Sequence, residues 1–377
     1  MEELNENMHN EILNFNETKR RQWMEERKPY SVLFELTSNC NMNCIHCYLQ
    51  NNHVQDQLDY NQVIEIIDLL YDIGILFVTF TGGEILTRSD FTDIYMYAKS
   101  KGFLVELFSN GYLFDDKIIK MLQEYPPLLV DISLYGSNEE TYQYVTGVKG
   151  AFEKVIENCR KLKEAGVRVS LKSPIIVPTV DCINEMKLIA SKLDVPFVYT
   201  FDICPTIDKD ECPRLLQVPL ETILKYEFED YYKQKKKYGR VELELDQKRK
   251  NEIADLMRNE CVYACNVALN SFVIDYKGNI CPCMKLRHKG EKMARETFNV
   301  IWEKFGIFAK KKASNEYRCK GCKSRYYCDV CPAEMDFLFA NEETRTDKIC
   351  KIAKIRQSFY CGDLTFEEAL KVASFDE

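Results

Sequence analysis

Short apolar segments alternate with amphipathic ones from residue 31 to residue 204, and this alternation limits the possible folds more than any other feature. The apolar segments are rich in β-branched and aromatic residues and have strand length, whereas the others repeat apolar residues at helical spacing. We therefore expect an α/β fold with a parallel sheet and right-handed crossovers, either doubly wound or curved into a barrel. The expected strands are 31–36, 76–81, 104–108, 130–134, 167–172 and 197–201, and the expected helices are 61–71, 90–101, 115–124, 151–165 and 183–193.

Polar or glycine-containing segments follow four of the expected strands. They are 39–47, 82–84, 109–111 and 133–136. In parallel sheets of this kind, ligands bind beyond the carboxyl ends of the strands. We therefore expect these segments to form a ligand site.

A different composition begins after Cys204. Two polar helical patterns, at 220–237 and 246–259, precede a region rich in cysteine. Ten of the 17 cysteines lie between Cys261 and Cys361. We expect four parts: a polar N-terminal arm at 1–30, an α/β core at 31–204, a helical linker at 205–260 and a small α+β domain at 261–377.

The cysteine content also bears on the compartment. The amino terminus lacks the basic and apolar stretches of a secretion signal, so we expect a cytoplasmic protein whose thiols hold metal or do chemistry. No apolar run is long enough to span a membrane. The formal net charge of −8 argues against nucleic acid as the main partner.

Cys40, Cys44 and Cys47 follow the first expected strand with the spacing C-x3-C-x2-C. In an iron–sulfur cube each of the four irons normally takes a thiolate, so three thiolates leave one iron open to another ligand. Two other interpretations are a zinc site completed by a residue such as His46, and three unligated thiols on a tight turn.

This motif, placed after the first strand of a βα repeat, resembles the signature of the radical S-adenosylmethionine (SAM) superfamily, and the segment 81–84 (TGGE) is similar to that family's GGE motif. The resemblance covers residue 31 to about residue 204. It implies a partial (β/α)6 barrel, a 4Fe–4S cluster on the three cysteines, and SAM bound to the open iron. Reductive cleavage of SAM would then give a 5′-deoxyadenosyl radical that abstracts a hydrogen atom from the substrate.

The same resemblance implies contacts to SAM. The expected contacts are close backbone approach at Gly82 and Gly83, the ammonium group with Glu84, the adenine with His46, the ribose with Ser133 and the carboxylate with Lys172. Each residue type also has a plain structural explanation: a turn, a surface acid, a strand-end hydroxyl or an edge charge. No general acid or base is singled out, so the catalytic residues stay unknown at this stage.

The cysteine-rich region contains paired C-x2-C units, which by themselves suggest a zinc ribbon as readily as iron–sulfur clusters. With the radical SAM motif upstream of them, the order of these cysteines resembles the SPASM extension, which in relatives holds two auxiliary 4Fe–4S clusters. The implied first set is Cys261, Cys265, Cys283 and Cys331, and the implied second set is Cys319, Cys322, Cys328 and Cys350.

One spacing departs from that extension. Cys328 and Cys331 are separated by two residues where the pattern has three, so Cys281 or Cys361 could take the place of Cys331. A β-hairpin over 273–280, turning at 277–278, is expected to present the cysteines at 281 and 283. The cysteines without cluster spacing are expected to be buried apolar side chains; they are Cys159, Cys182, Cys204 and Cys212.

Relatives with this extension act mostly on peptides and proteins, and an extra cluster can accept a second electron from the substrate radical. We therefore expect a radical SAM/SPASM maturase that makes an oxidative modification, such as a thioether or carbon–carbon crosslink, in a ribosomally synthesised peptide. Alternatives are a sulfatase-maturing-type enzyme, oxidation of a small molecule such as an aminocyclitol or a tetrapyrrole, and, more remotely, a non-catalytic iron–sulfur or zinc protein. Expected partners are the peptide or protein substrate, an electron donor such as flavodoxin or ferredoxin, and a separate leader-peptide-binding protein.

Overall fold

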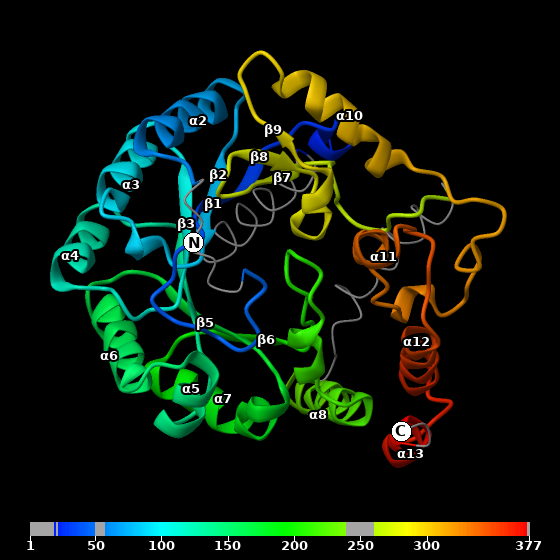
Figure 1. Cartoon of the computed structure of the whole chain (residues 1–377). Coiled ribbons are helices and arrows are strands. Elements are labelled where there is room, and N and C mark those ends of the chain that lie inside the picture. Colours follow the sequence, from blue (N-terminus) through cyan, green and yellow to red (C-terminus); the bar gives the residue numbers. More distant parts are fainter. Residues whose placement is uncertain (1–18, 20–21, 50–56, 239–259, 375–377) are drawn as a thin grey trace, which may run out of the picture.

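A computed structural model describes residue 19 and residues 22–49, 57–238 and 260–374. Most of the expected N-terminal arm and the whole helical pattern at 246–259 lie outside these residues. The described strands form one nine-stranded sheet in the order β6-β5-β4-β3-β2-β1-β7-β8-β9 (Figure 1). The first six strands are parallel and carry the expected helices between them, so the prediction of a partial (β/α)6 barrel is confirmed.

The barrel strands and helices lie within a few residues of the expected ranges. The strands are β1 (Ser31–Thr37), β2 (Phe77–Gly82), β3 (Leu104–Ser109), β4 (Leu129–Ser133), β5 (Val169–Pro174) and β6 (Phe197–Thr200). The helices are α2 (Tyr60–Asp72), α3 (Phe91–Ser100), α4 (Asp116–Glu124), α5 (Glu139–Thr146), α6 (Ala151–Glu164) and α7 (Ile183–Leu193). Helix α5 was not expected from the sequence.

Local sequence signals set the helix ends. Asp59 caps α2: its side chain accepts a hydrogen bond from the backbone N–H of Gln62, and the Gln62 side-chain oxygen accepts one from the backbone N–H of Asp59. Glycines with positive φ follow α2, α3 and α6, at Gly74, Gly102 and Gly166. The helices form a ring around the sheet and bury its outer face (Figure 1), which leaves the other, concave face of the strands toward the barrel interior.

The cysteine-rich region begins by extending the barrel sheet. Strand β7 (Ser271–Ile274) pairs in parallel with β1, and β8 (Asn279–Cys281) and β9 (Glu291–Lys292) follow in antiparallel order. Strands β7 and β8 form the expected hairpin, with Gly278 at φ +79° in its turn. The sheet is therefore continuous across the boundary that the sequence places at Cys261.

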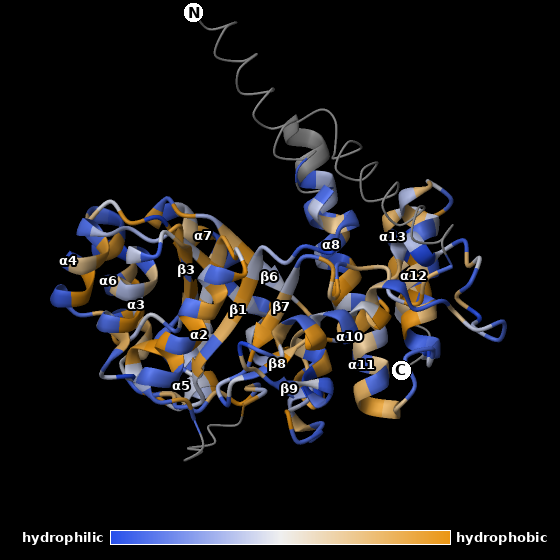
Figure 2. Cartoon of the chain, turned by 90° about the horizontal axis from the view of Figure 1, so that it is seen from above, coloured by the Kyte–Doolittle hydropathy of each residue, from blue (hydrophilic) through white to orange (hydrophobic). Residues whose placement is uncertain are grey.

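Helix α8 (Leu220–Tyr238) belongs by packing to the C-terminal helices. Its Leu224 and Phe228 are buried against α12 (Asp347–Tyr360) and α13 (Phe366–Ser374), and the Phe228 and Phe359 rings stack 3.7 Å apart. Figure 2 shows α12 and α13 at the opposite end of the molecule from α3, α4 and α6, with α8, α10 (Phe298–Lys310) and α11 (Pro332–Phe339) between. None of the described helices is both long and apolar enough to cross a membrane.

Candidate active site

The loop that carries the first three cysteines packs directly on the glycines after β2. The Gly83 N–H donates to the carbonyl of Thr37 and the Glu84 N–H to the carbonyl of Asn39, each over 2.8 Å. A Cβ at Gly83 would lie 2.2 Å from the Asn39 carbonyl oxygen, and Gly82 has φ +137°. The two glycines are thus required for the chain to approach its own cysteine loop; their approach to SAM stays a prediction.

Glu84 is fully buried, and hydrogen bonds from the chain hold its carboxylate. The Ser109 hydroxyl donates to both of its oxygens over 2.9 and 3.0 Å, and the backbone N–H groups of Asn110 and Leu86 donate over 2.6 and 3.1 Å. Burial raises the pKa of Glu84 to about 7, against the effect of these bonds. The carboxylate therefore ties the ends of β2 and β3 together, and its contact with an ammonium group stays a prediction.

The three thiols of the loop lie close enough to interact electrostatically. Burial raises the pKa of Cys40 to about 11, with further increases from Glu84 and Cys47. Burial, followed by Cys47 and Cys40, holds the pKa of Cys44 well above its usual range. Buried thiols of this kind are deprotonated when they coordinate a metal centre.

No three His, Cys, Asp or Glu side chains among the described residues converge tightly enough to hold a single metal ion. A four-iron cluster makes a different demand, because each thiolate binds a different iron and the sulfurs stay apart. Two buried polar atoms of the same loop, Asn41 Nδ2 and His46 Nδ1, have no hydrogen-bond partner among the residues that the structure describes. Since buried polar atoms are normally satisfied, they fit a loop that surrounds a bound group.

The other expected SAM contacts lie around this loop. The His46 ring is 5.2 Å from the ring of Tyr135, and burial lowers the His46 pKa to about 4. Ser133 ends β4, and its carbonyl accepts a hydrogen bond from the Tyr142 hydroxyl of α5. Helix α5 also holds the loop through its Val145 and Thr146 carbonyls, which accept from two backbone N–H groups of the loop. Sequence reasoning missed this support because α5 is short and weakly apolar.

Lys172 lies on the concave face of the barrel within a polar cluster. Its Nζ is 3.4 Å from Asp131 Oδ2, and its ammonium group lies over the Phe108 ring. Burial lowers the Lys172 pKa to about 8, whereas Asp131 acts in the opposite direction. We call this group the concave-face cluster; it comprises Thr79, Glu106, Phe108, Asp131, Ser170 and Lys172. Its ion pair gives Lys172 a partner within the chain, and its contact with a SAM carboxylate stays a prediction.

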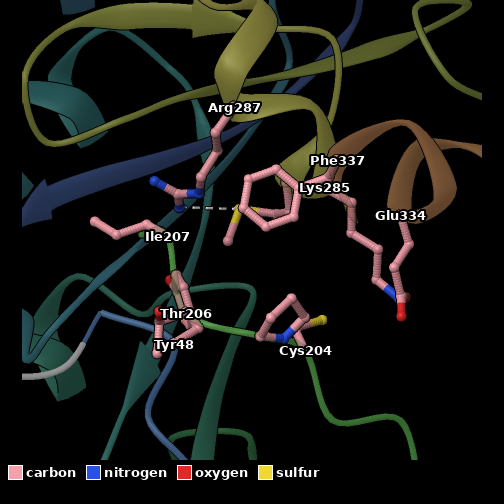
Figure 3. A pocket seen from close by; sticks show the side chains of 10 residues that line it. Tyr48, Cys204, Thr206, Ile207, Lys285, Arg287, Glu334 and Phe337 are labelled. Atoms are coloured by element: carbon pink, nitrogen blue, oxygen red, sulfur yellow. Dashed lines mark hydrogen bonds and ion pairs between the residues drawn. The ribbon is translucent and has the colours of Figure 1, made fainter. Parts of the chain in front are cut away.

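A buried ion pair joins the cysteine loop to the C-terminal region. Arg287 contacts the fully buried Glu35 of β1, which also accepts a hydrogen bond from the Tyr48 hydroxyl over 2.8 Å. Arg287 also lies 3.5 Å from the sulfur of Met284, as the dashed line in Figure 3 marks. An acid in an apolar strand was the only signal of this pair in the sequence, because its partner lies 252 residues away.

The structure brings three thiols of each implied auxiliary set into electrostatic contact: Cys265, Cys283 and Cys331 in the first set, and Cys319, Cys328 and Cys350 in the second. Cys331 raises the pKa values of Cys265 and Cys283, for which burial is the largest cause. Cys319 and Cys350 likewise act on Cys328, whose pKa burial raises to about 11. In the same turn as Cys319, Cys322 donates its N–H to the Cys319 carbonyl.

The remaining cysteines occupy varied surroundings. The backbone of Cys261 forms an antiparallel bridge with Lys312. Cys281 is buried, with its sulfur 3.8 and 3.9 Å from two backbone carbonyls. Cys361 is exposed, and Cys159 is buried as expected. The expectation that Cys212 is buried is wrong, because it lies exposed in the connection before α8.

Comparisons with known proteins agree with this arrangement. Residues 34–191 match the Radical SAM superfamily. The chain is 25% identical to the AdoMet-dependent heme synthase of Methanosarcina barkeri (strain Fusaro / DSM 804), over 79% of this chain and 92% of that protein. It is 29% identical to the antilisterial bacteriocin subtilosin biosynthesis protein AlbA of Bacillus subtilis (strain 168), over 42% of this chain but only 36% of AlbA.

A solved structure shows the same fold over most of the chain. Streptococcus suis SuiB bound to S-adenosylmethionine matches with a TM-score of 0.66 and 15% identity, covering 85% of this chain and 77% of SuiB. A second SuiB structure is bound to the precursor peptide SuiA. The family match falls on the strands that carry the C-x3-C-x2-C loop and the two glycines. Residues 34–191 therefore form a radical SAM domain, in a SAM-cleaving enzyme that binds SAM and an iron–sulfur cluster.

Proposed function

We propose that this enzyme oxidatively modifies a peptide or protein, and that it holds three 4Fe–4S clusters. Cluster-bound SAM supplies reductive cleavage and, through it, hydrogen-atom abstraction from the substrate. The proposed ligands of the SAM-binding cluster are Cys40, Cys44 and Cys47; the proposed SAM contacts are Gly82, Gly83, Glu84, Ser133, Lys172 and His46. The two implied auxiliary sets are proposed to hold the other clusters, with the fourth ligand of the first set considered below.

The observation that carries the peptide assignment is the charge of the concave face. Glu106 on β3 and Asp131 on β4 place two carboxylates on neighbouring strands, and Lys172 on β5 supplies one ammonium group beside Asp131. On β1, the fully buried carboxylate of Glu35 is already paired with Arg287. A surplus of carboxylates favours the N–H groups and cationic side chains of a peptide and disfavours a substrate with several carboxylates of its own.

A second candidate is oxidation of a tetrapyrrole, because one observation favours it. The similarity to the heme synthase of Methanosarcina barkeri covers 79% of this chain and 92% of that protein, so it extends into at least part of the cysteine-rich region. The peptide-related match to AlbA covers a much smaller share of the relative. The two candidates predict opposite substrate charge, and so they can be separated directly.

The test uses anaerobically reconstituted enzyme with SAM and a chemical reductant. One reaction contains a short peptide encoded next to the enzyme's gene, and the other contains an iron-bound porphyrin carrying propionate groups. Peptide modification predicts 5′-deoxyadenosine release together with loss of two hydrogen atoms from the peptide mass. Release of carbon dioxide from the porphyrin, with an unchanged peptide, would replace the first candidate by the second.

A matched pair of variants tests the charge argument. Asp131→Asn removes a carboxylate from the concave face, whereas Asp93→Asn removes one from the exposed outer helix α3. We expect the KM for a basic peptide to rise in Asp131→Asn and to stay unchanged in Asp93→Asn. Equal KM values in the two variants would contradict a substrate bound on the concave face. A leader-peptide-binding protein and a flavodoxin or ferredoxin donor are further proposals, which omission from the reaction would test.

A further inference from the structure

Lys285 joins two segments that are far apart in the sequence. Its ammonium group lies 2.8 Å from Asp202 Oδ2 and 2.5 Å from Glu334 Oε2. Asp202 follows β6 at the end of the barrel, and Glu334 lies in the first turn of α11. The side chain of Lys285 is only 22% exposed, so these contacts hold the two segments together at a largely buried point.

Each of the three residues in this contact has a cysteine close by in the sequence. Lys285 follows Cys283 by two residues, Asp202 precedes Cys204 by two, and the Glu334 N–H donates to the Cys331 carbonyl over 3.1 Å. This last bond fixes Cys331 at the start of α11. The contacts of Lys285 thus connect three segments that each contain a cysteine. Two of these cysteines, Cys283 and Cys331, belong to the implied first auxiliary set.

Cys204 faces the same place. It lines a pocket of about 190 Å³ together with Lys285 and Glu334, and Figure 3 shows its side chain on the side of the pocket where these two residues lie. Cys204 therefore lines the same pocket as the ion pair of Lys285 and Glu334. Lys285 is two residues from Cys283, and Glu334 is hydrogen-bonded to the backbone of Cys331, so the pocket lies beside two cysteines of the implied first auxiliary set.

We propose that Cys204 is the fourth protein ligand of the first auxiliary cluster, with Cys265, Cys283 and Cys331. This assignment rests on the auxiliary clusters of the proposed function and gives Cys204 the place that the resemblance assigns to Cys261. The Lys285 ammonium would offset part of the negative charge that four thiolates bring to a buried site. All four irons would then be held by the protein, and this cluster would have no open iron for a substrate.

The experiment compares the holoenzyme with Cys204→Ser and Cys261→Ser, each reconstituted anaerobically. Iron and sulfide per chain are measured, and the reduced clusters are examined by electron paramagnetic resonance and Mössbauer spectroscopy. The SAM-binding cluster is identified by its response to added SAM. A serine oxygen in place of a ligand thiolate changes the spectrum of its own cluster or causes the loss of about four irons. Cys159→Ser controls for replacement of a buried thiol outside the clusters.

We expect Cys204→Ser to change the spectrum or iron content of one auxiliary cluster, with the SAM response intact. An unchanged spectrum and full iron content in Cys204→Ser would overturn the assignment, whatever Cys261→Ser shows. If the wild-type enzyme holds only the SAM-binding cluster, the proposal of auxiliary clusters is wrong, and the assignment of Cys204 is wrong with it. Peptide turnover enters none of these measurements, so failure of the substrate proposal would leave the ligand assignment standing.

Discussion

Replacement of Arg287 by methionine would remove one partner of the buried ion pair with Glu35. The Glu35 side chain is 0% exposed and that of Arg287 is 13% exposed, so solvent screens the pair little. In Arg287→Met, the Glu35 carboxylate would keep only the Tyr48 hydroxyl as a hydrogen-bond donor among the contacts described here. Loss of one partner from a buried pair typically costs about 3–5 kcal/mol, because the remaining charge is left uncompensated.

A double-mutant cycle separates that cost from the value of the pair itself. Glu35→Gln combined with Arg287→Met removes both charges, and we expect it to recover much of the stability lost in Arg287→Met. The exposed pair Arg295 and Asp72 gives a matched control, since its side chains are 57% and 45% exposed. Arg295→Met should cost no more than about 1 kcal/mol.

The assay is anaerobic urea unfolding of the holoenzyme, followed by tryptophan fluorescence and by cluster absorbance. With a slope of about 3 kcal/mol per M, the loss expected for Arg287→Met lowers the midpoint by about 1 M or more. Arg295→Met should lower the urea midpoint by only a small fraction of the shift expected for Arg287→Met. The reasoning would be refuted by equal shifts in Arg287→Met and Arg295→Met, or by a double variant no more stable than Arg287→Met.

Two further predictions concern the candidate site. Gly83→Ala should displace the cysteine loop, because its Cβ would meet backbone carbonyl oxygens at 2.2 and 2.6 Å. The iron content of the protein and its affinity for SAM should therefore both decrease. Lys172, with its pKa lowered to about 8 by burial, should become reactive toward an acylating reagent as the pH rises through 8, as measured by mass spectrometry of labelled peptides. Asp131→Asn should shift this labelling to lower pH, since Asp131 favours the charged ammonium form.

Matched comparisons make both predictions decisive. Gly74→Ala is the control for Gly83→Ala, because its Cβ would meet no atom within 4 Å and its φ of +81° leaves only a local backbone cost of about 1 kcal/mol. Equal iron content in the two glycine variants would contradict the role given to Gly83. The exposed Lys149 serves as the labelling reference in the same digest. A labelling curve that Asp131→Asn leaves in place would contradict the ion pair at Lys172.

The barrel could be predicted from sequence because its signals are local. Each strand is a short apolar run, and the glycines and capping residues that delimit the helices lie next to them. The gathering of the cysteine loop with Gly82, Gly83 and Glu84 also followed, since parallel strands bring their carboxyl ends to one edge.

What could not be predicted depends on contacts between distant residues. Three such contacts leave no periodic trace in the chain: the pairing of β7 with β1, the ion pair of Glu35 and Arg287, and the position of Cys204 in one pocket with Lys285 and Glu334. Cys204 in particular looks like an ordinary apolar side chain when only sequence spacing is considered. The predicted roles of Gly83 and Glu84 were incomplete for the same reason. Gly83 packs on the cysteine loop and Glu84 binds the end of β3, and both partners are distant in the sequence.

The pairing of β1 with β7 has a consequence for synthesis of the chain. Ser31 lies opposite Ser271, so one edge of β1 has no strand to pair with until 240 further residues have been made. An unpaired edge in an apolar strand is a template for association with other chains. Barrel fragments that end before residue 271 should therefore aggregate during expression, and chaperone dependence should decrease once β7 is included.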